Sequence, residues 1–427
     1  MNEQDFTAVR GALVGVATRE RSEAEVEVSL QELQRLLQTA GGEAVFSMIQ
    51  NKESPDARTY LGSGKVAELA YYCGCNEVTL VVFDCELSPS QIRNLEEALG
   101  HVRVIDRSML ILDIFALHAE SSEGKLQVEL AQLKYTAPRL LGRGSELSRL
   151  GGGIGTRGPG ESQLETDRRH LARRIHALEQ ALAEVAENRR TQRQARDRSG
   201  LDRVAIVGYT NAGKSTLLNR LTDAGILTAD KLFATLDPTT RQCRLPGGET
   251  ILLTDTVGFI RNLPHHLIHA FKSTLEEAVA ADLLLVLVDA SDPEAARQIE
   301  VTEELLAEIG AADKKVLYVF NKCDLGAAVP GVGRMREGAV YISAATGQGV
   351  DLMLDRIEQL LHSNARRVVF RIPNDKQNLL ALLYRDATVE AVEYGAEAAT
   401  VTAVTDEKTY GRLQAYDTAK SEVKGDE

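Results

Sequence analysis

A glycine-rich loop between two predicted elements carries residues suited to phosphate chemistry. Gly208-Tyr-Thr-Asn-Ala-Gly-Lys-Ser215 follows an apolar run, 203–207, and precedes a helical pattern at 216–221. The glycines let the backbone N–H groups face a phosphate at the helix N-terminus. Lys214 is placed to reach the β- and γ-phosphates of a nucleotide, and the Ser215 hydroxyl to ligate Mg²⁺. The predicted contacts are Gly208, Tyr209, Thr210, Asn211, Ala212, Gly213, Lys214, Ser215 and Thr216.

A second phosphate motif ends the predicted strand 251–254. In Asp255-Thr256-Val257-Gly258 the aspartate can hold the Mg²⁺ shell through water, and the Gly258 N–H can sense a γ-phosphate. The D-x-x-G pattern is common by itself, but here it follows a complete phosphate loop and a strand. The predicted nucleotide contacts are Asp255, Thr256, Val257 and Gly258.

Between these motifs, a short segment is typical of a switch loop. Such a loop needs one threonine to complete the Mg²⁺ shell, and its ordering is the usual switch. We choose Thr235, with Thr239 and Thr240 as rivals. The predicted contacts are Phe233, Ala234, Thr235, Leu236 and Asp237, and the candidate catalytic residues are Lys214, Thr235 and Gly258.

Two further motifs select the base. Asn321-Lys322-Cys323-Asp324 follows the predicted strand 316–320, and Ser343-Ala344-Ala345 ends the strand 340–342. The aspartate can accept hydrogen bonds from guanine N1–H and N2–H₂, which adenine does not offer, so a mismatched base leaves it unpaired. We therefore predict binding of GTP and GDP rather than ATP, with GTP hydrolysis, through Asn321, Lys322, Cys323, Asp324, Ser343, Ala344 and Ala345.

Two residues bear on how hydrolysis is assisted. Phe259 stands where many GTPases have a glutamine that orients water, and phenylalanine cannot replace that glutamine chemically. Hydrolysis is therefore expected to be slow without a partner or a rearranged loop. Asn211 is a candidate K⁺ ligand, with a turn or capping role as the alternative.

The flanking regions predict a multidomain α/β protein with a doubly wound nucleotide-binding sheet. Residues 1–118 form a small α/β domain, with strands at 12–16 and 78–83 and helices at 26–37 and 88–99. Residues 201–364 carry the nucleotide motifs, and 365–427 form a small α+β domain with strands at 367–372, 388–394 and 399–404, a helix at 375–386 and an acidic tail.

Residues 119–200 predict a helical hairpin arm. Leucines 126, 130 and 133 mark one helix, and apolar residues from Leu164 to Val185 at heptad-like spacing mark another, on the order of 35–40 Å long. Between the helices, 142–160 holds eight glycines and three arginines, Arg143, Arg149 and Arg157. We expect this loop at the tip of the arm, where the alternative is a solvated helix with a flexible linker.

Charge and composition limit the possible partners. Residues 139–198 contain thirteen arginines, no lysine and eight acidic residues, a net charge of +5, which leaves −18 on the rest of a chain whose total is −13. Such a local basic segment predicts one anionic partner. Five scattered cysteines predict no disulfide framework. The longest apolar run, 283–288, is too short to span a membrane, so we expect a cytoplasmic protein without membrane insertion.

Beyond the nucleotide motifs, two stretches resemble the HflX family. They are Thr59-Tyr-Leu-Gly-Ser-Gly-Lys65 and Arg149-Leu-Gly-Gly-Gly-Ile-Gly-Thr-Arg-Gly-Pro-Gly-Glu161. The resemblance, over about residues 10–365, implies a GTPase that binds the large ribosomal subunit and splits or rescues stalled ribosomes under stress such as heat. It also implies that the arm reaches rRNA near the peptidyl-transferase centre, through Arg143, Arg149 and Arg157.

Other interpretations remain open from the sequence. Gly62-Ser-Gly-Lys65 could mark a second nucleotide site, but the position five residues before Gly64 is Thr59, so a turn at a helix start is favoured. A GTPase that acts as a regulatory switch on a protein partner, such as a protease or membrane component, would have the same nucleotide motifs. A nucleic-acid motor driven by ATP is opposed by Asp324. We expect a monomer.

Overall fold

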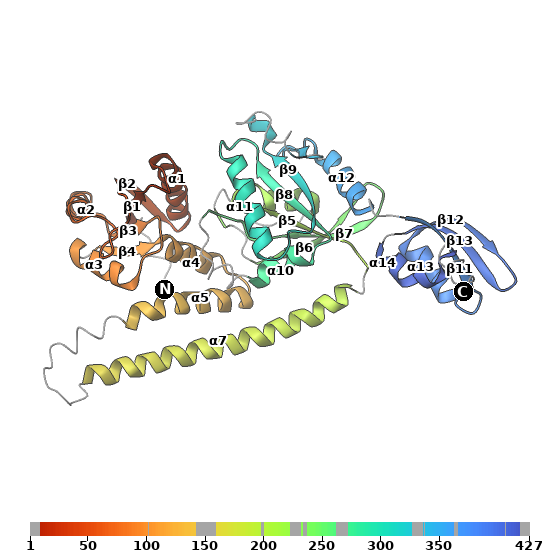
Figure 1. Ribbon diagram of the computed structural model, residues 1–427, viewed down its shortest axis with the longest axis horizontal. Helices are drawn as coiled ribbons and strands as arrows, with labels where there is room; N and C mark the ends of the chain where they lie inside the picture. The colour runs from red at the N-terminus through yellow and green to blue at the C-terminus, as the bar shows by residue number, and fades with distance from the viewer. Residues whose placement is uncertain are drawn as a thin grey trace.

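Three separate β-sheets follow one another along the chain in the computed structural model (Figure 1). The architecture is multidomain and mixed α/β, as predicted. The structure describes residues 9–100, 102–141, 159–197, 200–222, 232–233, 237–261, 272–326, 336, 338–362, 366–405 and 407–418. No helix in these ranges is long and apolar enough to cross a membrane.

The N-terminal unit, a name used here for β1–β4 and α1–α4, is built on a parallel sheet of order β2-β1-β3-β4. Its elements are β1 Val9–Ala17, α1 Glu23–Thr39, β2 Gly42–Asn51, α2 Ser63–Cys75, β3 Leu80–Phe83, α3 Pro89–Leu99, β4 Arg103–Asp106 and α4 Arg107–His118. The predicted Ser88 cap forms a capping box with Gln91. Helix α2 begins at Ser63 after Gly62, so the predicted turn at a helix start is confirmed.

Two long helices, α5 Ser122–Leu141 and α7 Pro159–Asp197, form the arm. They lie side by side below the N-terminal unit and the six-stranded sheet and run in opposite directions (Figure 1). Leu178 of the predicted apolar seam is buried, and Lys134–Glu179 is an interhelical ion pair at 2.7 Å. Helix α7 is longer than the predicted segment, since its 39 residues extend roughly 58 Å at the usual rise.

The central unit is a doubly wound six-stranded sheet of order β10-β9-β8-β5-β7-β6, parallel except for β6. Its strands are β5 Arg203–Gly208, β6 Thr239–Arg244, β7 Thr250–Asp255, β8 Leu283–Asp289, β9 Lys315–Asn321 and β10 Val340–Tyr341. Its helices are α8 Lys214–Thr222, α10 Lys272–Ala280, α11 Ala295–Glu308, the short 3-10 helix η1 Cys323–Leu325 and α12 Val350–His362.

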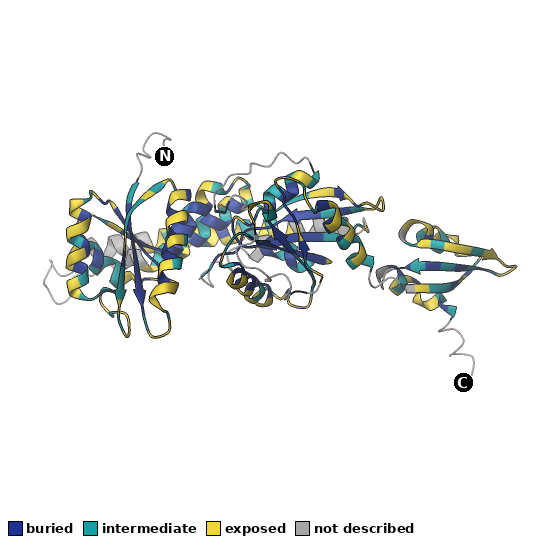
Figure 2. Cartoon of the chain, turned by 90° about the horizontal axis from the view of Figure 1, so that it is seen from above, coloured by how far each residue is buried: buried dark blue, intermediate teal, exposed yellow. Residues whose placement is uncertain are grey.

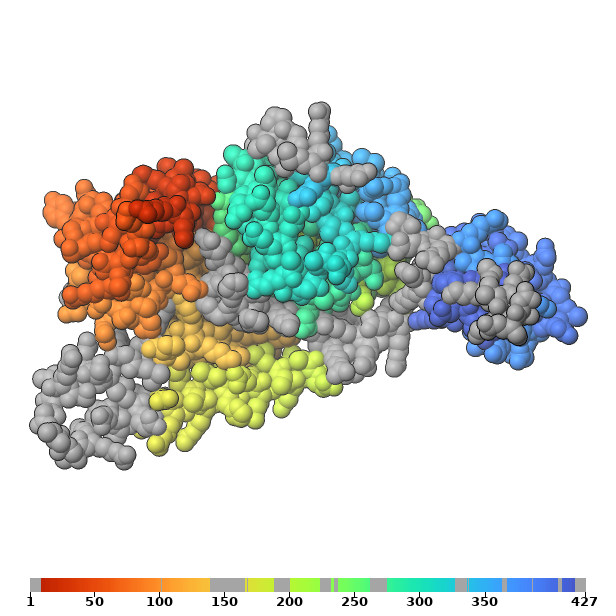
Figure 3. Space-filling view, viewed as in Figure 1, coloured from red at the N-terminus to blue at the C-terminus, as the bar shows by residue number. Residues whose placement is uncertain are grey.

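The C-terminal unit is an antiparallel sheet of order β11-β13-β12 with helices against it. Its elements are β11 Arg366–Pro373, α13 Gln377–Asp386, β12 Thr388–Tyr394, β13 Ala398–Thr405, α14 Glu407–Leu413 and the 3-10 helix η3 Gln414–Tyr416. Phe370 and Leu383 are fully buried in a core that belongs to this unit. The unit lies at the far end of the molecule from the N-terminal unit (Figures 1 and 3).

Alternate side chains of β5 enter two different cores. Val204 and Ile206 pack with α8 and α12 on one face of the central sheet. Ala205 and Val207 enter a second cluster, which continues through Phe115 and Leu33 into the N-terminal unit. Figure 2 shows buried residues on both sides of this junction. Because shared apolar burial is the main force between packed elements, the N-terminal unit is held firmly against the central sheet.

Candidate functional site

The predicted nucleotide motifs converge at one edge of the central sheet. The phosphate loop follows β5, the Asp255 motif ends β7, the Asn321 motif ends β9, and Ser343 follows β10. These four strands are parallel, so their carboxyl ends meet at the same edge. This is where open α/β sheets bind ligands.

The phosphate loop curls around its own lysine. Gly208 has φ +145°, and a Cβ there would lie 2.2 Å from the carbonyl oxygen of Leu287, so a side chain cannot fit. Lys214 is buried, and its Nζ donates to the carbonyl oxygens of Gly208, at 3.2 Å, and Tyr209, at 2.9 Å. The loop therefore holds the ammonium group at the start of α8, where anions are favoured.

The environment of Lys214 changes its titration. Burial lowers the pKa of Lys214 to about 8, and the nearby Asp255 carboxylate opposes that change. Asp255 is itself fully buried at the end of β7. Its Oδ2 accepts a hydrogen bond of 2.7 Å from the Ser215 hydroxyl. The Lys214 ammonium, the Ser215 hydroxyl and the Asp255 carboxylate are thus brought together at the phosphate loop.

Gly258 lies directly against the phosphate loop. A Cβ at this position would lie 2.9 Å from the Cα of Thr210 and 3.0 Å from the Nζ of Lys214. The next residue, Phe259, extends the sheet: its N–H donates to Gly208 at 3.0 Å, and its carbonyl accepts from Thr210 N–H at 2.8 Å. The Phe259 ring is 1% exposed, within the shared core. Its ring therefore packs in that core, and it offers no polar group to a water.

Asn321 joins the phosphate loop to the loop of Ser343, Ala344 and Ala345, which is called the base-side loop here. Its Nδ2 donates to the carbonyl of Ala212 at 2.8 Å, and its Oδ1 accepts from the N–H of Ala344 at 2.8 Å. Lys322 adopts φ +64° and pairs with Asp289 at 2.7 Å. Asp324 lies exposed on η1. The motif therefore fixes two loops through its asparagine and leaves the aspartate accessible.

Other predicted contact residues have structural bonds of their own. The Thr256 hydroxyl, which is fully buried, donates to the carbonyl of Ile206 on β5 at 2.8 Å. The carbonyl of Ala344 accepts from Nε of Arg220 on α8 at 2.6 Å. These bonds hold the ends of β7 and the base-side loop against the phosphate-loop elements.

The flanks of the predicted switch loop are attached outside the central sheet. Phe233 is buried, with its ring centroid 4.7 Å from that of Phe115 on α4. The Asp237 carboxylate accepts from the N–H groups of Glu120, at 3.1 Å, and Ser121, at 2.7 Å, just before α5. The side chains of Phe233 and Asp237 thus engage the N-terminal unit and the arm. The predicted residues Ala234, Thr235 and Leu236 lie outside the described residues.

The rival threonines lie in the sheet. Thr239 begins β6, and the hydroxyls of Thr240 and Thr254 are 2.9 Å apart. The arm-tip arginines Arg143, Arg149 and Arg157 also lie outside the described residues.

Helix α1 forms one wall of the site, which the sequence did not predict. A cavity of about 610 Å³ is lined by Arg35 and Gln38 of α1 together with Asn211 and Lys322 of the nucleotide motifs and Asp289 at the end of β8. A second cavity, of about 340 Å³, also joins α1 to the phosphate loop. The predicted site therefore lies at the junction of the N-terminal and central units.

A buried polar chain fixes this junction. The Tyr209 hydroxyl of the phosphate loop donates to Glu32 on α1, and it accepts from Arg261 N–H at 2.8 Å. Glu32 also pairs with Arg107, which is 2% exposed and bonds Asp84 at 2.8 Å. Burial, followed by the Glu32 charge, raises the pKa of Tyr209, so its hydroxyl remains a donor. Spacing along the chain carries no signal for contacts between residues so far apart.

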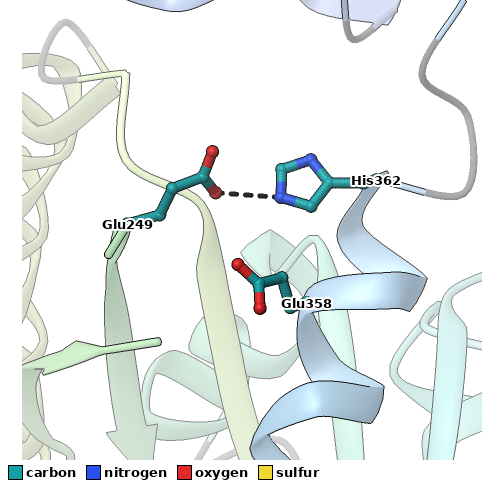
Figure 4. Close-up of side chains that lie close together, drawn as sticks. All are labelled: Glu249, Glu358 and His362. Atoms are coloured by element: carbon teal, nitrogen blue, oxygen red, sulfur yellow. Dashed lines mark ion pairs between the residues drawn. The ribbon is translucent and has the colours of Figure 1, made fainter. Parts of the chain in front are cut away.

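A separate cluster of potential ligands lies between α12 and the turn before β7 (Figure 4). His362 Nε2 lies 2.9 Å from Glu249 Oε2, and Glu358 accepts from Gly247 N–H at 3.3 Å. One atom from each of the three side chains lies within 4.8 Å of the others. These bonds give the cluster a structural role, since they link α12 to the β6–β7 turn.

Family models match almost the whole chain. They are described as GTP-binding GTPase N-terminal (residues 27–116), GTP-binding GTPase middle region (118–196), 50S ribosome-binding GTPase (203–322) and HflX C-terminal domain (332–407). A crystal structure of a GTP-binding protein from the archaeon Sulfolobus solfataricus in complex with GDP is 25% identical, with a TM-score of 0.44, over 82% of this chain and 98% of that one.

Relatives named GTPase HflX are similar over most of their length. The Lacrimispora saccharolytica protein is 55% identical over 357 residues, 83% of each chain. The Escherichia coli protein is 44% identical over 366 residues, 84% of this chain and 85% of its own. The Akkermansia muciniphila protein is 42% identical over 438 residues, 97% of this chain and 98% of its own. The chain therefore belongs to the HflX family of GTPases and is a GTP hydrolase.

Proposed function

We propose that this GTPase binds the large ribosomal subunit and uses GTP to dissociate or rescue stalled ribosomes under stress such as heat. The observation that carries the proposal is the match of residues 203–322 to a family described as 50S ribosome-binding GTPase. That match covers the sheet that bears the phosphate loop and ends at Lys322 of the base motif. Such a partner would place the protein in the cytoplasm.

Within this function, Lys214 and the Gly258 N–H serve the β- and γ-phosphates, and Asp324 accepts from the guanine edge. The geometry supports these roles, since Lys214 and Gly258 lie together and Asp324 is accessible at the same sheet edge. Thr235 is assigned to the switch between Phe233 and Asp237, whose attachments hold both flanks of that segment.

P-loop GTPases generally use Mg²⁺. The residues present fit that ion, because the Ser215 hydroxyl and the Asp255 carboxylate place hard oxygen donors 2.7 Å apart beside Lys214. Ser215 and Thr235 would hold Mg²⁺ directly, and Asp255 through water. When bound, the ion neutralises charge on the β- and γ-phosphates.

Asn211 lies on the cavity wall and is the proposed K⁺ ligand. A comparison of GTP turnover in potassium buffer and in sodium buffer tests the role of K⁺.

The arm is the proposed rRNA contact. Its described part is a long helix pair, with Arg168 and Arg173 exposed toward the tip end of α7. Arginine suits phosphate contact and base stacking in rRNA. We also propose that the chain divides into domains at 1–118, 119–200, 201–364 and 365–427, and that it acts as a monomer.

Cosedimentation with purified large subunits tests the arm. Replacing Arg149 and Arg157 with alanine is expected to lower binding and reduce its dependence on salt while GTP affinity is retained. The matched control replaces Arg19 and Arg58, two exposed arginines of the N-terminal unit. If the arm variant binds subunits as tightly as the control variant, the arm is not the rRNA contact. Failure of the unmodified protein to bind would favour a protein partner instead.

A further inference from the structure

An arginine on α8 is bonded to the base-side loop. Arg220 lies in the last turn of the helix that begins at Lys214 of the phosphate loop. Its Nε donates to the carbonyl oxygen of Ala344 at 2.6 Å, and its Nη2 donates to the carbonyl oxygen of Ala345. One guanidinium group therefore binds two successive carbonyls, which suits the fixed fork of its donors.

The chain after the base-side loop leaves room for this guanidinium group. Gly347 has φ +93°, and a Cβ at this position would lie 2.8 Å from Nη1 of Arg220. A side chain would press on the guanidinium group, so glycine permits the close approach of α8 and this loop.

The bond to Ala344 sets the direction of the next N–H group. In a planar trans peptide unit, the C=O of one residue and the N–H of the next point in opposite directions. The peptide between Ala344 and Ala345 is trans. Because the carbonyl of Ala344 points toward Arg220, the N–H of Ala345 points away from α8.

Neighbouring N–H groups of the loop already have acceptors. The N–H of Ala344 donates to Oδ1 of Asn321 at 2.8 Å, and the N–H of Thr346 donates to the Ser343 hydroxyl at 3.1 Å. Ala345 is exposed, and no acceptor for its N–H occurs among the residues that the structure describes. The loop therefore presents one N–H donor to a ligand.

Guanine carries the acceptor that this donor fits. Its O6 lies beside the N1–H group, whereas adenine has an amino group in place of O6. The base-side loop follows β10 and Asp324 follows β9, so both lie at the same edge of the sheet. An N–H directed at position 6 of the base therefore favours guanine and leaves the adenine amino group without an acceptor.

We propose that Arg220 is a positioning residue that determines base specificity, because its bonds to Ala344 and Ala345 direct the Ala345 N–H at O6 of the bound guanine. The inference rests on the proposed assignment of Asp324 and the base-side loop to the base. It concerns O6, whereas Asp324 is assigned to N1–H and N2–H₂, so different nucleotide analogues test the two.

The test compares the dissociation constants of the full chain for GDP, 6-thio-GDP and IDP at pH 7. In 6-thio-GDP a sulfur, which is a weaker acceptor, replaces O6, whereas IDP keeps O6 and lacks the N2 amine. The unmodified chain is expected to prefer GDP over 6-thio-GDP by at least about threefold. Arg220→Ala should weaken GDP binding by about three- to tenfold, the usual value of one hydrogen bond, and 6-thio-GDP binding by less than about twofold.

Two further variants and a kinetic readout separate positioning from folding. Arg220→Lys offers one ammonium group in place of a fork, so it should retain an intermediate preference for GDP. Arg244→Ala removes an exposed arginine of β6, at the opposite edge of the sheet from β10, and should match the unmodified protein. For Arg220→Ala, KM for GTP should rise while turnover at saturating GTP stays within about twofold, since the proposed contact is to the base.

The ratio of dissociation constants decides the outcome, because an unfolded fraction lowers the number of binding sites and leaves that ratio unchanged. The proposal is overturned if Arg220→Ala weakens GDP and 6-thio-GDP binding by the same factor, or if the unmodified chain does not distinguish the two nucleotides. Asp324→Asn should lower the preference for GDP over IDP, which Arg220→Ala should keep within about twofold. An unchanged preference in Asp324→Asn would contradict the proposed role of Asp324 instead.

Discussion

The Tyr209 hydroxyl donates a hydrogen bond to the carboxylate of Glu32, which joins the phosphate loop to the N-terminal unit. Glu32 in turn pairs with the buried Arg107. A tyrosine in a phosphate loop is therefore held by a helix that precedes it by more than 150 positions. Through this bond, movement of the loop is coupled to α1.

Glu32→Gln is expected to destabilise the junction by about 1–3 kcal/mol, because Arg107 loses one charged partner in a buried site. Hydrogen exchange of α1 in the GDP complex measures this effect, and its protection should fall. Glu27→Gln removes a charge from an exposed position on the same helix and should leave exchange unchanged. Equal exchange in the two variants would contradict the role of the Tyr209–Glu32 bond.

Asp237→Ala tests the attachment between the switch segment and the arm. The change removes an acceptor for the N–H groups of Glu120 and Ser121, so the start of α5 should lose about 1 kcal/mol of local stability. Faster hydrogen exchange over residues 120–126 would report the loss. Asp351→Ala, an exposed acidic residue in the first turn of α12, is the matched control. Unchanged exchange in Asp237→Ala would show that this contact does not hold α5.

Nucleotide binding should be accompanied by proton uptake at the Lys214 amine. Burial lowers its pKa to about 8 in the folded protein, whereas unfolded lysine titrates near 10.4, so its depressed pKa makes stability rise as pH increases from 8 to 10. Bound phosphates favour the charged amine and raise that pKa again. GDP binding at pH 8.5 should therefore take up a fraction of a proton, and affinity should weaken above pH 8.

Calorimetry of GDP binding in buffers of different ionisation enthalpy measures this uptake. Lys214→Ala is expected to bind GDP more weakly, without the uptake. Proton uptake that persists unchanged in Lys214→Ala would assign it to another group.

Asp324→Asn tests reading of the base. Asparagine keeps one acceptor oxygen and replaces the other with an NH₂ donor, so one of the guanine N1–H and N2–H₂ groups loses its acceptor and GDP affinity should fall by about 100-fold or more. Xanthosine diphosphate, which carries an oxygen at position 2, should bind the variant better relative to GDP, since an amide can donate to that oxygen. Unchanged preference for GDP over the xanthine nucleotide would remove Asp324 from base recognition.

Local patterns explain why much of the fold was predictable. The α1 face of Val26, Leu30, Leu33 and Leu37 is buried as its spacing predicts, and β12 Thr388–Tyr394 has the predicted limits. Each motif of the site sits in a strand–loop or loop–helix segment, where nearby residues dictate the backbone. Parallel strands then bring these segments to one edge without further information from the side chains.

The sequence contains weaker signals for some other elements of the fold. Strand β2 was not predicted, because Met48 is its one buried residue and it shows no apolar alternation. Helix α4 was missed because it is apolar on nearly every side, which removes helical periodicity. The contacts of Phe233 with Phe115 and of Asp237 with Ser121 join residues more than 100 positions apart, and the chain order does not indicate which surfaces meet.

The most direct test of the proposed function is GTP turnover by the full chain with and without purified large ribosomal subunits. The account predicts strong stimulation by large subunits and little by small subunits, with the stimulation reduced when Arg149 and Arg157 are replaced. Measurable hydrolysis that large subunits do not increase would contradict a ribosomal role, while leaving the protein a GTP hydrolase of the HflX family.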